Sequence, residues 1–263
     1  MPASPVVFVS HGSPMLPLEP GSAAGMLREL GRELLGHGPR AVVVLSPHWM
    51  TRGVALGAHE RPPTLHDFHG FDPALRDLRY EVPGSPEVAA EARRLLQAAG
   101  MTASLDALRG LDHGMWVPLQ LMFARAELPV VALSMPWPLD PMGAWHLGQA
   151  LRPLREQGVL LLGSGSLTHN LHEFRACAAV DATAEPYVRE FAEWVAAAIR
   201  AGDVKQLLAW DTRAPHALRA HPTPEHLLPL HFALGAAGSG ARARRWHGGV
   251  HYGMLAMDAW SFD

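Results

Sequence analysis

VVFVSHGSP, residues 6–14, joins a short apolar run to a histidine in a turn of small residues. The run over residues 6–9 shows no polar alternation, which is typical of a strand that is covered on both faces of a sheet. Three more runs have the same character, at residues 41–45, 130–133 and 159–162. These four runs predict a sheet whose strands are buried on both sides.

Segments with helical patterning lie between these runs. Residues 23–35 carry an apolar stripe at helical spacing, and residues 143–156 and 185–200 are also amphipathic. Ser85 and Pro86 can open a further helix as N-cap and first-turn proline, and Gly100 can end it. Strands that alternate with helices predict an α/β fold with a central, largely parallel or mixed β-sheet and helices on both faces.

The composition is that of one ordinary globular domain. The chain has 263 residues, of which 48% are hydrophobic and 18% charged, and no stretch resembles a linker or a repeat. We therefore expect a single domain over residues 1–263. The net charge of −3 gives no reason to expect a nucleic-acid partner.

The cysteine count limits the kinds of metal site that are possible, and the length of the apolar runs bears on membrane insertion. Cys177 is the single cysteine, which excludes an intrachain disulfide and a thiolate metal cluster. No apolar run approaches the roughly 20 residues that are needed to cross a bilayer. We expect no membrane partner, a cytoplasmic location, and a monomer or small homo-oligomer.

Histidine is the unusual feature of the composition, with 16 in the chain. His11 follows the first predicted strand, His48 follows the second in Ser-Pro-His-Trp, and His169 follows the fourth after a Gly-Ser-Gly-Ser turn. In open α/β sheets, ligands bind at the carboxyl ends of the strands. A lone histidine after a strand is more often a hydrogen-bonded loop residue, but three at successive strand ends favour a shared metal site.

Two further histidines are candidates for the same site. Thr223 can cap a helix whose first turn holds Glu225, which would put His226 near a helix start beside a carboxylate. His113 lies in a turn before the apolar run over residues 117–123. His66 and His69 could line a pocket, but we interpret them, like the remaining histidines, as ordinary structural residues.

Other chemistries find little support. The Gly-Ser-Gly-Ser segment at residues 163–166 lacks the lysine of a phosphate loop and does not complete a dinucleotide fingerprint. No Gly-x-Ser-x-Gly nucleophile motif is present, and Cys177 has no activating motif. The sequence therefore indicates a metal enzyme without an organic cofactor.

Six short phrases together resemble the class III extradiol ring-cleavage dioxygenases, the type of the protocatechuate 4,5-dioxygenase β subunit, and within them the DOPA dioxygenase branch. They occur in the family's order over nearly the whole chain, at residues 11–14, 46–49, 62–68, 111–114, 168–171 and 222–226. One such phrase would be weak, whereas six in order are specific.

The resemblance implies a divalent metal, iron(II) in active enzymes, with zinc able to occupy the site. Its ligands would be His11, His48 and His226. The position of His169 would be either a further ligand or an acid/base beside the metal, and His113 would line the pocket as a second acid/base candidate. The implied substrates are a catechol such as DOPA and O₂.

One departure from the wider family concerns the last ligand. The wider family uses a glutamate there, whereas the DOPA branch uses a histidine near Glu225 and His226. Adjacent helical residues point about 100° apart, so both cannot face the metal equally. We favour His226 and keep Glu225 as the rival.

Neutral imidazole suits iron(II), and ligands on one face leave open positions for substrate and dioxygen. The hypothesis is therefore an iron(II)-dependent extradiol dioxygenase. A zinc-dependent hydrolase that uses the same histidines is one alternative, because three histidines and a water also make a hydrolytic site. A non-catalytic metal-binding protein of this fold is the other.

Overall fold

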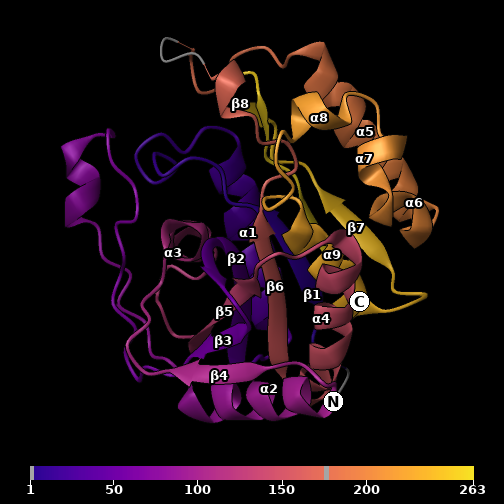
Figure 1. Cartoon of the computed structure of the whole chain (residues 1–263). Helices are drawn as coiled ribbons and strands as arrows, with labels where there is room; N and C mark the ends of the chain where they lie inside the picture. Colours follow the sequence, from indigo (N-terminus) through magenta and orange to yellow (C-terminus); the bar gives the residue numbers. More distant parts are fainter. Residues whose placement is uncertain (1–2, 175–177) are drawn as a thin grey trace.

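The structure is a computed structural model that describes residues 3–174 and 178–263. An eight-stranded sheet in the order β4-β3-β5-β2-β6-β1-β10-β7 forms its centre (Figure 1). These strands are β1 (Val6–Ser10), β2 (Ala41–Thr51), β3 (Val54–Gly57), β4 (Ala103–Asp106), β5 (Val130–Pro136), β6 (Val159–Gly165), β7 (Ala243–Trp246) and β10 (Ala259–Phe262). A two-stranded ribbon of β8 (Val250–His251) and β9 (Leu255–Ala256) stands apart from it. All four predicted strands are present.

The sheet is mixed, with a parallel centre. Strands β5, β2, β6 and β1 pair in parallel, whereas β10 pairs antiparallel with both β1 and β7. Parallel pairing brings the carboxyl ends of the four central strands to one edge. The segments that follow these strands therefore meet there.

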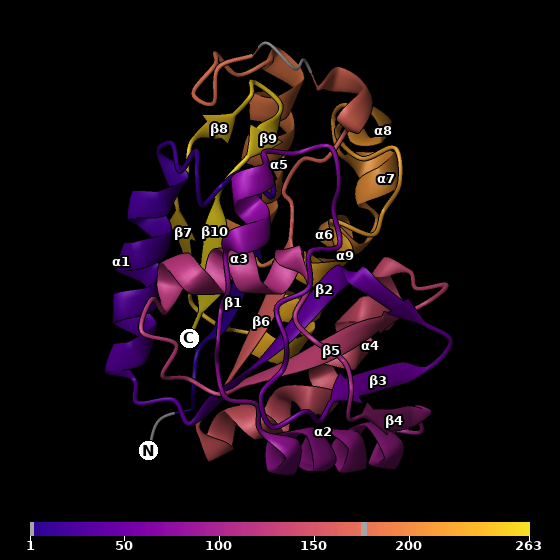
Figure 2. The same cartoon turned by 90° about the vertical axis from the view of Figure 1, so that its left-hand side faces the viewer.

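Helices cover both faces of the sheet, and the predicted α/β class is confirmed. Side chains alternate along β2, so Val43 and Leu45 pack on one helical layer while Val42 and Val44 pack on the other. The first layer holds α2 (Pro86–Ala98), α4 (Pro141–Leu151), α5 (Pro186–Arg200) and α9 (Leu228–Ala237). The second layer holds α1 (Ala23–Gly36) and α3 (His113–Met122), and Figures 1 and 2 show these layers on opposite sides of the sheet.

Shorter elements complete the chain. Three 3₁₀ helices, η1 (Pro73–Asp77), η2 (Arg152–Gln157) and η3 (Leu171–Glu173), and the short helices α6 (Val204–Leu208), α7 (Trp210–Arg213) and α8 (Ala217–Ala220) lie in the connections. Ser85 caps α2 by accepting from the Val88 amide, as predicted. The helix predicted over residues 143–156 divides into α4 and η2.

Three local predictions differ from the structure around the histidines. The strand that carries His48 continues past a register shift between Leu45 and Met50, so His48 lies within β2. His113 is the first residue of α3 instead of a turn residue. Thr223 caps no helix, since α9 begins only at Leu228 and the Thr223 hydroxyl donates to Oε1 of Glu225.

Within the described residues, no helix combines the length and the apolar character that crossing a bilayer requires. Cys177 lies outside the described residues.

Candidate metal centre

Three imidazole rings from three distant segments converge at the carboxyl edge of the sheet. His11 follows β1, His48 lies in β2, and His226 lies in the turn before α9. The ring centroids are 5.2 Å apart for His11 and His48, 5.5 Å for His11 and His226, and 5.1 Å for His48 and His226. Imidazoles that bind one metal at about 2.1 Å in tetrahedral geometry have centroids about 5 Å apart. This nearly equilateral triangle therefore fits one divalent ion.

Each ring of this triangle has a nitrogen that could bind a metal. Nε2 of His11 lies 3.4 Å from Nε2 of His48. Nε2 of His226 is buried and has no hydrogen-bond partner, while its Nδ1 lies 3.2 Å from Oε1 of Glu225. A buried polar atom without a partner is costly unless something binds it. A cation would remove that cost.

His113 joins the same cluster from α3. One of its ring nitrogens lies within 4.8 Å of donor atoms of His11 and His48, and its ring centroid is 4.0 Å from that of His48. By donor distance alone it forms a triad with those two residues. However, Nδ1 of His113 is bound to Oδ2 of Asp67 at 2.9 Å, and its backbone amide donates to Oδ1 of the same carboxylate at 2.8 Å. Asp67 thus fixes both the ring and its backbone.

His169 lies on the other side of the cluster. Its ring stacks on that of His226, with centroids 3.6 Å apart and planes at 9°. His169, Glu225 and His226 also have donor atoms within 4.8 Å of one another. All five candidate histidines therefore meet in one place, and Glu225 stands at its border.

Burial keeps most of these imidazoles neutral. Loss of water, together with the neighbouring histidines, holds the pKa of His11 and of His226 well below the ordinary value. Desolvation is also the main cause that lowers the pKa of His48 to about 3 and that of His169 to about 4. Because a metal ligand must offer a free lone pair, neutral rings at physiological pH suit metal binding.

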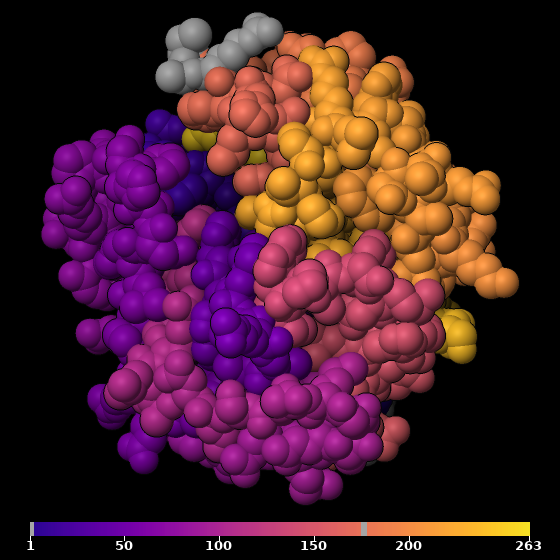
Figure 3. All heavy atoms as spheres, viewed as in Figure 1, coloured from indigo at the N-terminus to yellow at the C-terminus, as the bar shows by residue number. Residues whose placement is uncertain are grey.

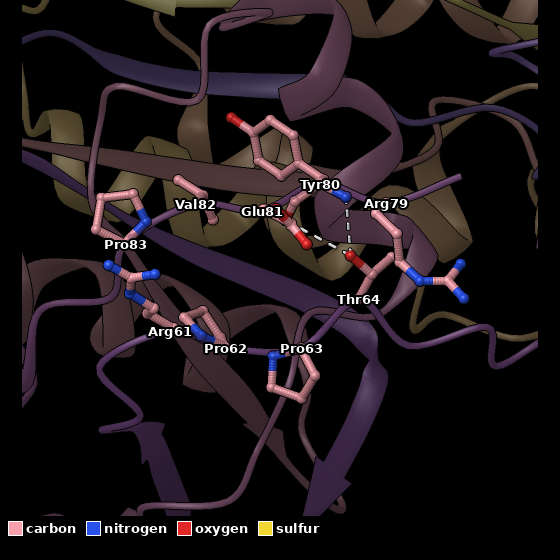
Figure 4. Close-up of a pocket in the computed structure, with 9 residues that line it drawn as sticks. All are labelled: Arg61, Pro62, Pro63, Thr64, Arg79, Tyr80, Glu81, Val82 and Pro83. Atoms are coloured by element: carbon pink, nitrogen blue, oxygen red, sulfur yellow. Dashed lines mark hydrogen bonds between the residues drawn. The ribbon is translucent and has the colours of Figure 1, made fainter. Parts of the chain in front are cut away.

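Asp67 lies in a long loop, and its charge is stabilised by its partner. Burial alone would raise the pKa of this carboxyl, but the hydrogen bonds and charge of His113 lower it to about 2. The loop is braced by Thr64, whose Oγ1 accepts from the Tyr80 amide at 2.9 Å (Figure 4). Leu65 also pairs with Leu111, through its amide and the Leu111 carbonyl at 2.8 Å. The loop is thereby held against the segment that opens α3.

A buried network supports the segments that carry His48 and His113. Asp112 precedes His113 and accepts from the Ser46 hydroxyl at 2.7 Å and from Arg109 at 2.8 Å. Burial raises the pKa of Asp112, although both of its hydrogen bonds favour the charged form. Asp112 therefore ties the part of β2 that carries His48 to the start of α3, which carries His113.

Sequence reasoning did not single out Asp67, the Asp112 network, or Ser164, whose Oγ lies 3.2 Å from Nδ1 of His11. Asp67 lies within one of the six family-like phrases, and Ser164 lies within the Gly-Ser-Gly-Ser segment, so the sequence signal was present but carried no role. His66 lies away from the cluster, with Nε2 3.1 Å from the Leu78 carbonyl oxygen, and His69 is exposed. Both lie in the loop, and both line a pocket of about 350 Å³ together with Phe68 and Phe71, the possibility that the sequence left open.

The surface around this loop has two hollows. Figure 3 shows one between the purple segment that includes η1 and the orange segments on the right. The other is a pocket of about 590 Å³ between residues 61–64 and residues 79–83 (Figure 4). None of the five clustered histidines lines that second pocket, so it does not belong to the candidate metal centre.

Comparison with known proteins gives concordant matches over the chain. The family model for the catalytic LigB subunit of aromatic ring-opening dioxygenase matches residues 5–259. A Beta vulgaris protein named 4,5-DOPA dioxygenase extradiol is 38% identical over 257 residues, which covers 97% of this chain and 95% of that protein. An Escherichia coli K12 protein of the same name is 39% identical over 237 residues, with 88% and 84% covered. The crystal structure of an uncharacterized Escherichia coli K12 protein matches with a TM-score of 0.80 at 30% identity, covering 99% of this chain and 100% of that one.

Proposed function

The chain belongs to the family of the catalytic LigB subunit of aromatic ring-opening dioxygenases, and on that premise we propose that it is an iron(II)-dependent extradiol dioxygenase that opens a catechol ring with O₂. A DOPA-like catechol is the proposed substrate class, because relatives named 4,5-DOPA dioxygenase extradiol match most of the chain. The observation that carries the proposal is the triangle of the His11, His48 and His226 rings, in which Nε2 of His226 is buried without a hydrogen-bond partner.

His11, His48 and His226 are the proposed metal ligands. Glu225 lies against Nδ1 of His226, and it also accepts from the Thr223 hydroxyl at 2.9 Å. A carboxylate in that position orients the ring and leaves Nε2 for the metal. This supports His226 over Glu225 as the third ligand.

His169 is proposed as an acid/base group and not as a fourth ligand. Lone pairs of an imidazole lie in the ring plane, and the planes of His169 and His226 are parallel and 3.6 Å apart at their centroids. An ion in the plane of His226 therefore lies outside the plane of His169. With its pKa lowered to about 4, the His169 ring is neutral at physiological pH and can accept a proton from a catechol hydroxyl.

His113 is the second proposed acid/base group. Its Nδ1 is engaged by Asp67, so Nε2 is the atom that can exchange a proton with bound substrate. A carboxylate behind an imidazole holds the ring in place and stabilises the positive charge that follows protonation. When bound, the metal would hold a catechol and dioxygen side by side and allow electrons to pass between them.

The test is anaerobic reconstitution with iron(II), and separately with zinc, with the bound metal quantified in each preparation. Catechols including DOPA are then added, followed by O₂. The proposal predicts a yellow ring-opened product and oxygen uptake with iron only. No turnover across a broad catechol panel with iron bound would refute it, and zinc-dependent cleavage of esters or amides without O₂ would instead indicate a hydrolase.

A further inference from the structure

The first turn of α3 contains a carbonyl that its own helix leaves without the usual donor. Pro118 lies inside α3 and has no N–H, so the carbonyl oxygen of Gly114, four residues earlier, lacks its helical hydrogen bond. The hydroxyl of Ser164, in β6, donates to that oxygen. Both residues are buried. Because a carbonyl oxygen can only accept, the single hydroxyl proton of Ser164 is committed to Gly114.

The same hydroxyl oxygen also contacts a proposed metal ligand. Oγ of Ser164 lies 3.2 Å from Nδ1 of His11. With its proton directed to Gly114, the oxygen must accept, so Nδ1 of His11 is the donor. A neutral imidazole carries one N–H, which leaves the lone pair of Nε2 free. It is Nε2 of His11 that faces Nε2 of His48.

We propose that Ser164 is a positioning residue that holds His11 in the tautomer with the proton on Nδ1, and so presents its Nε2 to the metal. The inference deepens the proposed function and rests on its metal site. Ser164 touches neither substrate nor metal in this scheme. It acts through His11 by joining β6, the start of α3 and the end of β1.

Gly114 also packs closely against a second proposed ligand. A Cβ at position 114 would lie 2.6 Å from Oγ of Ser46 and 2.8 Å from Cδ2 of His48. The α3 turn therefore packs against the His48 ring while its carbonyl receives the Ser164 hydroxyl. One backbone unit thus contacts the supports of two of the proposed ligands.

The test compares Ser164→Ala with Ser134→Ala. Ser134 is the matched control, since it is also fully buried in a parallel strand, and its Oγ accepts from the Ala55 amide at 2.7 Å and contacts Oγ1 of Thr51 at 2.6 Å. The Zn²⁺ dissociation constant is measured by competition with a chromophoric chelator. We expect Ser164→Ala to weaken binding by roughly 10–100-fold, and Ser134→Ala to leave it unchanged although both lower the melting temperature.

Long-range proton–nitrogen NMR of the metal-free protein gives an independent readout. His11→Ala identifies the His11 signals by their loss. We expect the proton on Nδ1 in the unaltered protein and a population with the proton on Nε2 in Ser164→Ala. Unchanged zinc affinity in Ser164→Ala, or a His11 proton on Nε2 in the unaltered protein, would overturn the proposal.

These measurements use no catechol and no O₂. A protein that fails to cleave rings but shows the expected tautomer and affinity change would refute the proposed function and support the role of Ser164. If the protein cleaves catechol rings but Ser164→Ala changes neither the zinc affinity nor the His11 tautomer, the proposed function stands and the role of Ser164 is refuted.

Discussion

The rings of His169 and His226 lie face to face, with centroids 3.6 Å apart and planes 9° from parallel. Two stacked imidazoles cannot direct their in-plane lone pairs at one ion. The family resemblance leaves open whether His169 binds metal or moves protons, and this stack favours the second role. It also places His169, the proposed proton acceptor, directly beside a proposed ligand.

Exchange of these two histidines for alanine should therefore have different consequences. We expect His226→Ala to lose bound iron, and His169→Ala to keep it while ring cleavage slows by roughly 10²–10⁴-fold. Elemental analysis gives the iron content per chain, and oxygen uptake gives the rate. If His169→Ala contained no iron and His226→Ala contained a full complement of iron, the two roles would have to be exchanged.

His11 and His48 should each be indispensable for metal binding. Their Nε2 atoms lie 3.4 Å apart, close enough for one ion to bridge them. We expect His11→Ala and His48→Ala to abolish metal binding, measured by equilibrium dialysis with zinc. His66→Ala serves as the control, since His66 contacts the Leu78 carbonyl away from the cluster. Unchanged metal content in both ligand variants would disprove the ligand assignment.

Asp67→Asn should impair turnover without removing the metal. The amide oxygen can still accept from the His113 backbone, but the NH₂ group that replaces Oδ2 cannot accept from Nδ1–H. We expect kcat to fall by roughly 10–100-fold at full iron occupancy. Asp72→Asn is the control, because Asp72 caps η1 in the same loop and is exposed. Equal kcat values in the two variants would remove Asp67 from the mechanism.

Gly114→Ala should disturb the metal centre through packing alone. The added Cβ would meet Ser46 and the His48 ring at 2.6 and 2.8 Å, distances that force one of them to move. We expect weaker zinc binding and a loss of about 1–3 kcal/mol in unfolding free energy. Gly25→Ala, in α1 with no atom within 4 Å of the new Cβ, should instead stabilise by about 0.5–1 kcal/mol. Tight zinc binding by Gly114→Ala would show that this turn tolerates movement.

The metal-free protein should lose stability as the pH falls below about 6.5. Burial lowers the pKa of His221 to about 3, so the folded protein does not take up the proton that the unfolded chain binds. Above about pH 6.5 the His221 ring is neutral in both the folded and the unfolded protein, so it adds no pH dependence to the unfolding free energy. Below that value, each such histidine costs roughly 1.4 kcal/mol per pH unit until the folded pKa is reached.

His221→Gln isolates this contribution. Glutamine can keep the hydrogen bond that Nε2 of His221 makes to the Leu167 carbonyl at 2.9 Å, but it does not titrate. Urea unfolding with chelator present, followed between about pH 7 and pH 5, should show a shallower slope for the variant by about one proton. Identical slopes would mean that His221 is protonated in the folded state.

The sequence predicts both the sheet and the clustering of histidines, because both depend on the parallel pairing of buried strands. Strands buried on both faces have unbroken apolar sequences. Parallel pairing brings the residues that follow these strands to one edge of the sheet. His11 and His169 were therefore expected near each other, although residues 12–168 separate them in the chain. The two layers of helices were expected because predicted helices alternate with these strands along the chain.

Other features depend on contacts that no local pattern records. Asp67 and His113 are 46 positions apart and meet only because a long loop returns to α3. The helix expected after Thr223 begins only at Leu228, and the His226 carbonyl accepts from the Ser166 amide, a contact made across the fold. Ser164 has a role only through the missing N–H of Pro118, which the sequence shows but whose partner the fold supplies.

A metal held by His11, His48 and His226 is proposed to support cleavage of a catechol ring by dioxygen. The most direct measurement is mass spectrometry of the product formed from DOPA and isotopically labelled O₂ by the iron(II)-loaded protein. We expect a ring-opened product that carries both labelled oxygen atoms and that is absent with His226→Ala. An iron-loaded protein that consumes no O₂ and leaves every catechol ring intact would contradict it.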